Sequence, residues 1–399
     1  MLRFVPPAGA PLKITQILSA LKTVFPSNGR LEESLPLCAT RLHVQYVFGV
    51  SSGRAALWLI LKCLQRLRPE RDVVALPAYT CFSVGASVVR AGLKIHPVEV
   101  DPKTLDFDLS QLDALPDKRL LCIITSNLFG FVNDLPRIRQ AAKAKDAFVL
   151  DDAAQALGAM RSGQFAGTLG DVGLYSLGRG KAVAAMEGGL IVTNSEEIAR
   201  VMQEEAKNLH APSLVHGAWL LLEMLVYSLL LRPRLYWVPN SLPFLRLGVT
   251  EFDPKFPTNE LHSLCKALLP RLLDGLQEVN EIRRANARAI VKALAQHPDF
   301  DFPRPAPNTH PTFVRLPVVA RDNVTRERAV SQLRTAGIGA SSFYPNAICD
   351  IPGIEPHMAA RDFHRKHAEL LSQRLLTLPV NPLLVPEDLQ RMVGVLSAL

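Results

Sequence analysis

The stretch AFVLDDAAQALGAMRSGQFAGTLGDVGLYSLGRGKAVAAMEGGLIVTN, which spans Ala147–Asn194, decides the fold of this chain. Its first apolar run ends in the acidic pair Asp151-Asp152. A second apolar run ends at Ser176, and Lys181 follows five residues later in a glycine-rich turn that precedes a third run. Such runs predict strands of a covered, largely parallel sheet, in which ligands bind at the carboxyl edge. The stretch therefore predicts a ligand site that contains these polar side chains.

A carboxylate, a hydroxyl and an amine at one sheet edge are the groups that pyridoxal 5'-phosphate (PLP) requires. The carboxylate keeps the ring nitrogen protonated, the hydroxyl holds the phosphate and the amine binds the cofactor covalently. Asp151 and Asp152 compete for the first role, whereas Ser176 and Lys181 fill the other two. Each residue alone is ordinary, since loop lysines are usually solvated and acidic residues at strand ends often cap helices. The prediction depends on their order and spacing.

Four motifs of this stretch resemble those of one enzyme family. They are Asp152-Ala153-Ala154-Gln155, Gly167-Thr168-Leu169-Gly170-Asp171, the interval from Ser176 to Lys181, and Glu187-Gly188-Gly189. Their order is similar to that in PLP-dependent sugar aminotransferases of the DegT/DnrJ/StrS group, which have the aspartate-aminotransferase fold (fold type I). The resemblance implies that Asp152 faces the ring nitrogen and that Gln155 faces the ring or its phenolic oxygen. It also implies that Lys181 holds PLP and then moves a proton during amino transfer.

Short apolar runs alternate with helical segments along the chain, as in a parallel α/β sheet. From about residue 252, two long helical segments (Thr258–Leu273 and Leu276–Leu294), a final helix (Pro386–Ser397) and further short runs predict a smaller α/β domain. In it, GIGASSFYP and LLTLPVNP resemble family motifs. We predict an N-terminal extension with an amphipathic helix (1–36), a large PLP-binding domain (37–250) and a small C-terminal domain (251–399). Seven runs are candidate strands, which is the number in the large domain of the resembled fold: Val44–Val50, Asp72–Leu76, Lys94–Val100, Leu120–Ser126, Ala147–Leu150, Val172–Ser176 and Leu190–Thr193.

A second set of phosphate contacts is predicted where the first strand ends, at Ser52-Gly53-Arg54. Free N–H groups at a helix N-terminus bind phosphate, and a glycine allows the backbone to approach closely. Related enzymes usually have S-G-T-A-A-L, so Arg54 replaces a threonine here, yet its guanidinium can pair with phosphate and its backbone N–H is retained. Gly53, Arg54 and Ser176 are therefore predicted to hold the phosphate.

Three departures from the family pattern concern the substrate and the partner subunit. The family places an aromatic residue after P-x-x-T to stack on the ring, whereas Cys81 stands here, so that Phe82 or Tyr79 is the candidate substitute. The histidine that the family has before its next glycine turn is Asn127. The N-x-R-M segment, through which one subunit contacts the phosphate of its neighbour, is not recognisable, and Lys255 is its candidate replacement.

Composition and charge narrow the class of protein. The chain has 399 residues, a formal net charge of +8 and a mean hydropathy of +0.13, and it is long enough for one large and one smaller domain. It has no run of Lys and Arg and no basic stripe with aromatic residues, which argues against a nucleic-acid partner. The six cysteines are scattered without a CxxC pair, so neither a metal site nor disulfides are expected. The N-terminus does not resemble a secretory signal, and we expect a cytoplasmic protein.

Two apolar segments lie outside the resemblance. Leu214–Leu231 has His216 and Glu223 as its main polar interruptions, and with its basic, aromatic flank it forms an insertion at about residues 214–248. The central glutamate and this flank argue against a spanning helix. The alternatives are an element at the inner face of the membrane, and a buried helix or subunit interface. The segment Lys13–Phe25 has one apolar helical face, and most such helices dock on their own domain.

The sequence predicts a PLP-dependent aminotransferase that moves an amino group from an amino acid, glutamate, to a keto-sugar. The resemblance implies a nucleotide-linked sugar for polysaccharide or glycan synthesis, and a homodimer with its sites at the subunit interface. One alternative is a lipid-linked or membrane-associated acceptor, motivated by the apolar insertion. Another is a non-catalytic PLP-binding relative, motivated by Cys81 and the missing partner motif. Sugar dehydratases that resemble this group have histidine in place of the lysine, so Lys181 argues against dehydration.

Overall fold

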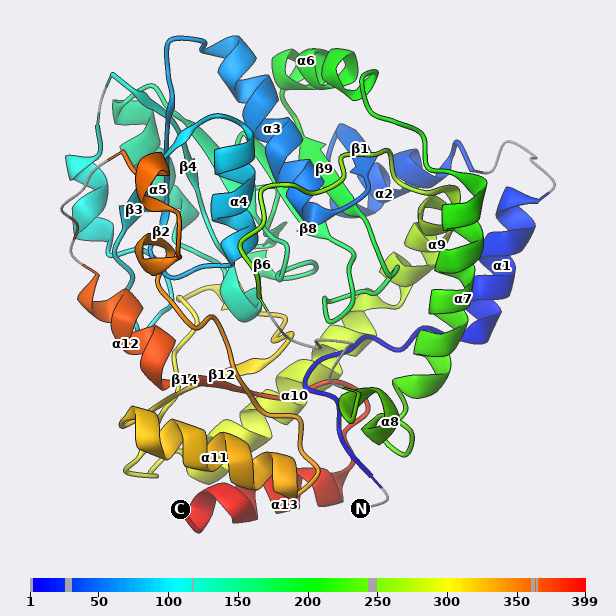
Figure 1. Cartoon of the computed structure of the whole chain (residues 1–399), viewed down its shortest axis with the longest axis vertical. Coiled ribbons are helices and arrows are strands. Elements are labelled where there is room, and N and C mark those ends of the chain that lie inside the picture. Colours follow the sequence, from blue (N-terminus) through cyan, green and yellow to red (C-terminus); the bar gives the residue numbers. More distant parts are fainter. Residues whose placement is uncertain (1–2, 26–30, 117, 243–249, 360–362, 364) are drawn as a thin grey trace.

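In the computed structural model, which describes residues 3–25, 31–116, 118–242, 250–359, 363 and 365–399, the predicted runs pair into one sheet. The strand order is β1-β9-β8-β5-β4-β2-β3 (Figure 1). Strands β3, β2, β4, β5 and β8 pair in parallel, whereas β9 is antiparallel to both β8 and β1. The predicted seven-stranded, mostly parallel sheet is confirmed. The strands are β1 Tyr46–Val50, β2 Val73–Pro77, β3 Lys94–Val98, β4 Leu120–Ile124, β5 Phe148–Asp152, β8 Val172–Ser176 and β9 Gly189–Thr193.

Helices cover both faces of this sheet, which gives the large domain three layers (Figure 1). Successive strand residues such as Leu190 and Ile191 enter opposite cores, which is why the inner strands are continuously apolar. One core includes side chains of α3 (Gly53–Leu67), α4 (Phe82–Arg90) and α6 (Glu196–Ala206). The other includes side chains of α2 (Ser34–Leu42), α5 (Leu135–Ala144) and α9 (Ser263–Asp274).

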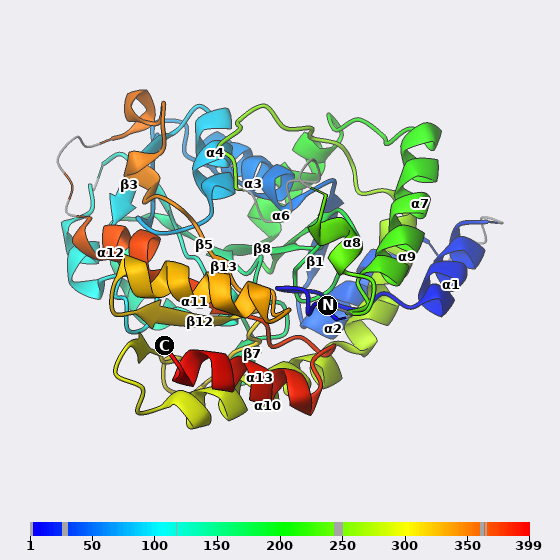
Figure 2. The ribbon, with the colours of Figure 1, turned by 60° about the horizontal axis from the view of Figure 1, so that its bottom comes forward.

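The small domain packs helices against a four-stranded antiparallel sheet with the order β10-β12-β14-β13 (Figure 2). Its core joins this sheet to α10, α11 and α13, and the bounds of α10 and α13 are those that the sequence predicts. The elements are α10 Leu276–Leu294, β10 Phe300–Asp301, β12 Leu316–Ala320, α11 Asn323–Thr335, β13 Ser341–Ser342, α12 Lys366–Arg374, β14 Leu375–Leu378 and α13 Pro386–Ser397.

The apolar cores of the two domains draw on different residues than a division of the chain at residue 250 would give. The apolar side chains of α9 belong to a large-domain core, whereas the small-domain core includes helix residues only from Ala287 onward. At the N-terminus, Val5 pairs with Ile338 and Arg3 forms an ion pair with Asp388 at 2.7 Å, so the first residues pack on the small domain. The chain therefore crosses between the two domains in its first residues and again along α10.

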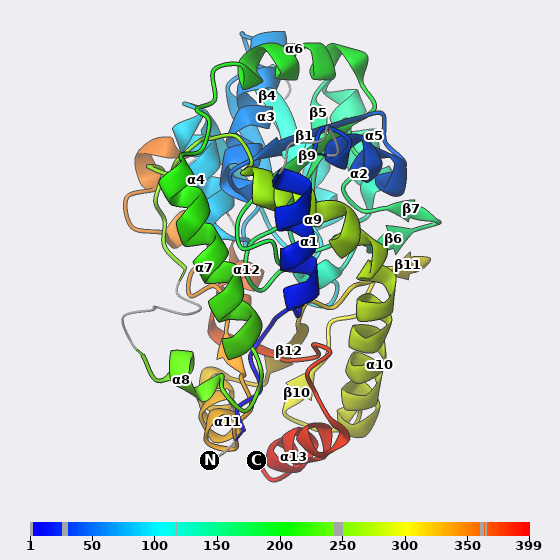
Figure 3. The same ribbon diagram turned by 90° about the vertical axis from the view of Figure 1, so that its right-hand side faces the viewer.

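Two helices lie at one side of the molecule, α1 (Ile14–Val24) and α7 (Leu214–Leu230), and the short α8 (Trp237–Asn240) follows (Figure 3). Each docks through only part of its apolar surface: α1 buries Ile17 and Ala20 but exposes Ile14 and Leu18. Among the described residues, no helix has both the length and the apolar character needed to cross a membrane. The remaining elements are β6 Met160–Arg161, β7 Gln164–Phe165, β11 Thr309–His310, η1 Leu109–Ala114, η2 Leu128–Gly130, η4 Ile348–Asp350 and η5 Glu355–His357.

Candidate active site

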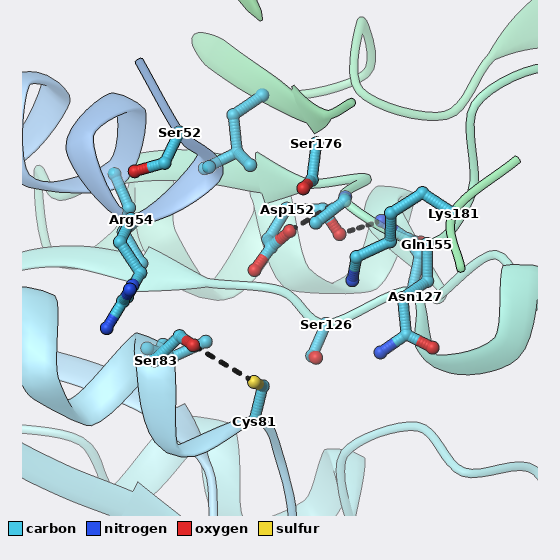
Figure 4. A pocket seen from close by; sticks show the side chains of 15 residues that line it. Ser52, Arg54, Cys81, Ser83, Ser126, Asn127, Asp152, Gln155, Ser176 and Lys181 are labelled. Carbon is cyan, nitrogen blue, oxygen red and sulfur yellow. Dashed lines mark hydrogen bonds between the residues drawn. The ribbon is translucent and has the colours of Figure 1, made fainter. Parts of the chain in front are cut away.

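The carboxyl ends of the parallel strands surround a cavity of about 180 Å³ (Figure 4). β5 ends at Asp152 and β8 ends at Ser176, while Ser52 follows β1 and precedes α3. The residues after β2 and β4 contribute Cys81 and Ser126 to the opposite side of the cavity. All six predicted site residues line it, namely Gly53, Arg54, Asp152, Gln155, Ser176 and Lys181.

The structure distinguishes the two adjacent aspartates. Asp151 is fully buried and accepts hydrogen bonds from the Asn127 side-chain amide at 2.7 Å, the Thr125 hydroxyl at 3.1 Å and the Gly167 N–H at 2.6 Å. It therefore ties the strand ends to the glycine-rich loop. Asp152 instead lines the cavity, where its carboxylate can meet a ligand.

Asp152 and Lys181 reach into the same space, and each influences the ionisation of the other (Figure 4). Burial raises the pKa of Asp152 to about 6, although the Ala154 N–H and the Lys181 amine oppose this shift. Burial lowers the pKa of the Lys181 amine below its ordinary value, although the Cys81 and Asp152 side chains oppose this shift. A less basic lysine has more of its uncharged, nucleophilic form near neutral pH.

The end of the cavity beside α3 forms an anion cradle. Ser52 caps this helix by accepting a hydrogen bond from the Ala55 N–H at 3.1 Å. A Cβ atom on Gly53 would lie 3.2 Å from the Ser176 hydroxyl oxygen, so the glycine keeps the helix N-terminus and this hydroxyl close together. The Arg54 guanidinium lies 5.2 Å from the centroid of the Phe256 ring and borders the same end. Backbone N–H groups, a hydroxyl and a cation thus surround one position for a phosphate.

Gln155 is fixed at both ends of its amide. Its Oε1 accepts a hydrogen bond from the Phe129 N–H at 3.2 Å, and its Nε2 donates to the Tyr344 hydroxyl at 3.0 Å. Tyr344 follows β13, 189 residues further along the chain, and its side chain packs in a large-domain core. The segment that contains Tyr344 resembles a family motif, but the sequence does not indicate that this tyrosine contacts Gln155.

The candidate aromatic substitutes lie outside the cavity. Tyr79 is fully buried, and the Phe82 ring packs against Tyr344 with centroids 6.3 Å apart. Cys81 lines the cavity in the position that the resemblance assigns to the aromatic ring, and its thiol donates to the Ser83 hydroxyl at 3.3 Å. The side chains on this side of the cavity are therefore small and polar.

The loop that contains Lys181 is held by a buried arginine that sequence reasoning missed. Arg283 of α10 donates to the carbonyl of Ala182 at 3.1 Å and to the side-chain oxygen of Asn280 at 2.8 Å. Asn280 in turn donates to the carbonyl of Leu157, two residues after Gln155. Burial lowers the pKa of Arg283 to about 10. The general periodicity of α10 gave no signal for this contact.

These residues fit PLP. The cavity combines a carboxylate whose buried position favours a cationic partner, an amine of reduced basicity, and an open anion cradle at a helix N-terminus. Asp152 would hold the ring nitrogen, Lys181 would hold the reactive carbon, and Ser176 with the start of α3 would hold the phosphate. Among the described residues, no cluster of His, Cys, Asp or Glu could hold a metal ion, and all six cysteines are free thiols.

Comparison with known proteins agrees with this assignment. The model of the DegT/DnrJ/EryC1/StrS aminotransferase family matches residues 13–219 and 257–397. A UDP-N-acetyl-3-dehydro-alpha-D-glucosamine 3-aminotransferase of Acidithiobacillus ferrooxidans is 26% identical over 96% of this chain and 91% of its own.

Relatives also include an enzyme of a different reaction. A GDP-4-keto-6-deoxy-D-mannose 3-dehydratase of Yersinia pseudotuberculosis is 27% identical over 74% of this chain and 72% of its own. In structure, the aminotransferase PseC of Helicobacter pylori, which acts in pseudaminic acid biosynthesis, has a TM-score of 0.79 over 99% of this chain and 98% of its own, at 15% identity. This likeness shows the fold, in agreement with the predicted fold type I.

Proposed function

The chain belongs to the DegT/DnrJ/EryC1/StrS aminotransferase family, and from this premise we propose that it transfers an amino group from glutamate to a keto-sugar. It is a PLP-dependent aminotransferase. The named relatives support a nucleotide as the carrier of the sugar, and polysaccharide or glycan synthesis as the context. The single observation that carries the proposal is that Asp152, Ser176 and Lys181 line one cavity.

The roles of the side chains follow from their positions. When bound, PLP supplies an electron-accepting ring that stabilises negative charge on the adjacent carbon of the amino acid. Asp152 would hold the ring nitrogen in its protonated form, and Gln155, fixed by its bonds to Phe129 and Tyr344, would face the ring. Lys181 would hold PLP covalently, and its amine, once free, would carry the proton that amino transfer moves.

Lys181 also favours amino transfer over dehydration. The resemblance implies that dehydratases of this group have histidine at the corresponding position, whereas this chain has the lysine in the cavity. An amine can both bind the cofactor covalently and act as a proton carrier, which amino transfer requires in each half-reaction.

The absorbance of the purified protein tests this function. A covalently held cofactor absorbs near the boundary of visible and ultraviolet light, and glutamate should shift that band as the amino form accumulates. Lys181→Ala should abolish both the shift and turnover, whereas Lys143→Ala, an exposed residue of α5, should retain them. Full turnover by Lys181→Ala would refute the assignment. A wild-type protein with no band would favour the non-catalytic alternative.

We further infer a cytoplasmic homodimer whose α1 and α7 contact the inner face of the membrane. Exposed apolar side chains on both helices, exposed cations such as Lys13 and Arg232, and the net charge of +8 support contact with anionic lipid. Sedimentation with anionic and with neutral vesicles at low salt tests the contact. Protein that remains in the supernatant with anionic vesicles would contradict it.

A further inference from the structure

A second cavity, of about 470 Å³, adjoins the loop that contains Lys181. Its walls come from α7 and α8, the N-terminal segment and the small domain, elements that approach one another in Figures 1 and 3. Arg179 and Gly180, which directly precede Lys181, also line it. A molecule in this cavity would therefore contact the two residues that directly precede the reactive lysine.

One wall of this cavity is the apolar face of a single helix. Trp219, Leu222, Val226 and Leu230 of α7 line it at intervals of three or four residues, which places them on one helical face. The family model matches residues up to 219 and again from 257, so most of this wall lies in a segment that the family model leaves unmatched.

Three arginines also line the cavity, Arg179, Arg315 and Arg334. Arg179 is paired with Glu223 of α7 at 3.1 Å, but no ion pair within the described part of the chain gives Arg315 or Arg334 a carboxylate partner. Arg315 donates instead to the Ser341 hydroxyl at 2.8 Å. Two arginines without acidic partners beside an apolar wall favour a ligand that has an anionic group and a hydrocarbon part.

The apolar character continues from the cavity to the surface. Leu225 and Leu229 on other faces of α7 are exposed, as are Ile14 and Leu18 of the neighbouring α1 (Figure 3). Exposed cations stand at the ends of these two helices: Lys13, Lys22, Arg232 and Arg234. A hydrocarbon chain that leaves the cavity along α7 would enter an apolar surface flanked by cations, as at an anionic bilayer.

We propose that this cavity binds a phosphorylated lipid as the carrier of the acceptor, with its phosphate at Arg315 and Arg334 and its first apolar segment against α7. The proposal rests on the proposed amino transfer to a keto-sugar, and it differs from the relatives in one part: a lipid takes the place of the nucleotide as carrier of that sugar. A nucleotide shares the phosphate, but its base and ribose need hydrogen-bonding partners, whereas the α7 wall consists mainly of hydrocarbon. Such a wall binds an apolar chain by removing both from water.

Calorimetric titration of the PLP-loaded enzyme tests this proposal, with farnesyl phosphate as the probe and with UDP and farnesol as comparison ligands. Farnesyl phosphate should bind more tightly than either, because only it combines the anion with the chain. Leu222→Asp should weaken its binding by about tenfold or more. Ile282→Asp is the matched control, because Ile282 of α10 is 38% exposed, near the 49% of Leu222, and lines neither the cavity nor the apolar surface beside α7.

The control should retain wild-type affinity for farnesyl phosphate. Arg334→Gln should weaken the binding of farnesyl phosphate but not that of farnesol. Equal losses of affinity in Leu222→Asp and Ile282→Asp, or tighter binding of UDP than of farnesyl phosphate, would overturn the lipid assignment. Thermal unfolding establishes that each variant is folded. An enzyme whose absorbance responds to glutamate but that does not bind farnesyl phosphate contradicts this inference alone. A protein without the absorbance band that binds farnesyl phosphate contradicts the proposed function alone.

Discussion

Adjacent side chains at the end of β5 have different tasks because a strand directs successive residues to opposite faces. Asp151 accepts four hydrogen bonds, two of them from backbone N–H groups in the glycine-rich loop. We predict that Asp151→Asn lowers the free energy of unfolding by about 2–4 kcal/mol, since the new amide N–H₂ would face donors. Chemical denaturation measures this loss. Asp152→Asn should change the free energy of unfolding by less than half as much, and equal losses would contradict the division of roles.

Asp152 should instead control affinity for the cofactor in a pH-dependent way. Its pKa is about 6, so the carboxylate is present above that pH and is lost as the pH falls through it. Above pH 7, Asp152→Asn should weaken PLP binding by about 10- to 100-fold, the value of one charge-assisted hydrogen bond. Below pH 5, wild type and variant should converge, because both side chains are then uncharged. A ratio of affinities that stays constant from pH 5 to 8 would exclude this role.

At the scale of elements, α10 links the small domain to the loop that contains the reactive lysine. Arg283 is buried without a carboxylate partner among the described ion pairs, and its Nε has no hydrogen-bond partner. We predict that Arg283→Met changes the free energy of unfolding by less than about 1.5 kcal/mol, since removal of a buried charge offsets the lost bonds.

The same variant should lower kcat by about 3- to 10-fold, because the Ala182 carbonyl beside Lys181 loses its anchor. It should also move the pH at which the absorbance band changes, a readout that a purely structural role would not affect. Arg288→Met, on an exposed part of α10, serves as the control. Unchanged kcat and an unchanged pH profile for Arg283→Met would show that this contact does not position the lysine.

The elements themselves were predictable where local pattern determines them. All seven sheet strands are recognisable because inner strands buried on both faces have continuous apolar sequence, and α10 and α13 have the expected bounds. The two-residue strands β6, β7 and β11 are too short to produce a period. The place of α9 was not predictable, since its apolar face fits either domain and only tertiary packing assigns it to the large-domain core.

At the scale of the whole molecule, three of the residues that would hold the cofactor come from one stretch of chain, and the start of α3 adds the phosphate cradle. Asp152, Ser176 and Lys181 lie within thirty residues of one another, so their spacing could be read from the sequence. Tyr344 contacts Gln155, and Arg315 lines the second cavity, only because the chain after α10 folds back over this part of the molecule. The α7 wall is likewise formed by packing between distant segments, which spacing along the chain cannot indicate.

The whole molecule is expected to form a homodimer in which each subunit contributes to the site of the other. Lys255, the candidate replacement for the partner-contacting motif, is exposed and does not line the cavity of its own chain. If it contacts the phosphate in the partner subunit, Lys255→Ala and Lys181→Ala each inactivate a homodimer, but a mixed dimer keeps one intact site. Random pairing makes half of the dimers mixed, so co-refolded variants should recover about a quarter of wild-type activity. If Lys255 instead serves its own subunit, both sites of the mixed dimer are defective and no activity returns. Sedimentation velocity on the same mixture verifies that dimers have formed, and a monomer would refute the shared site directly.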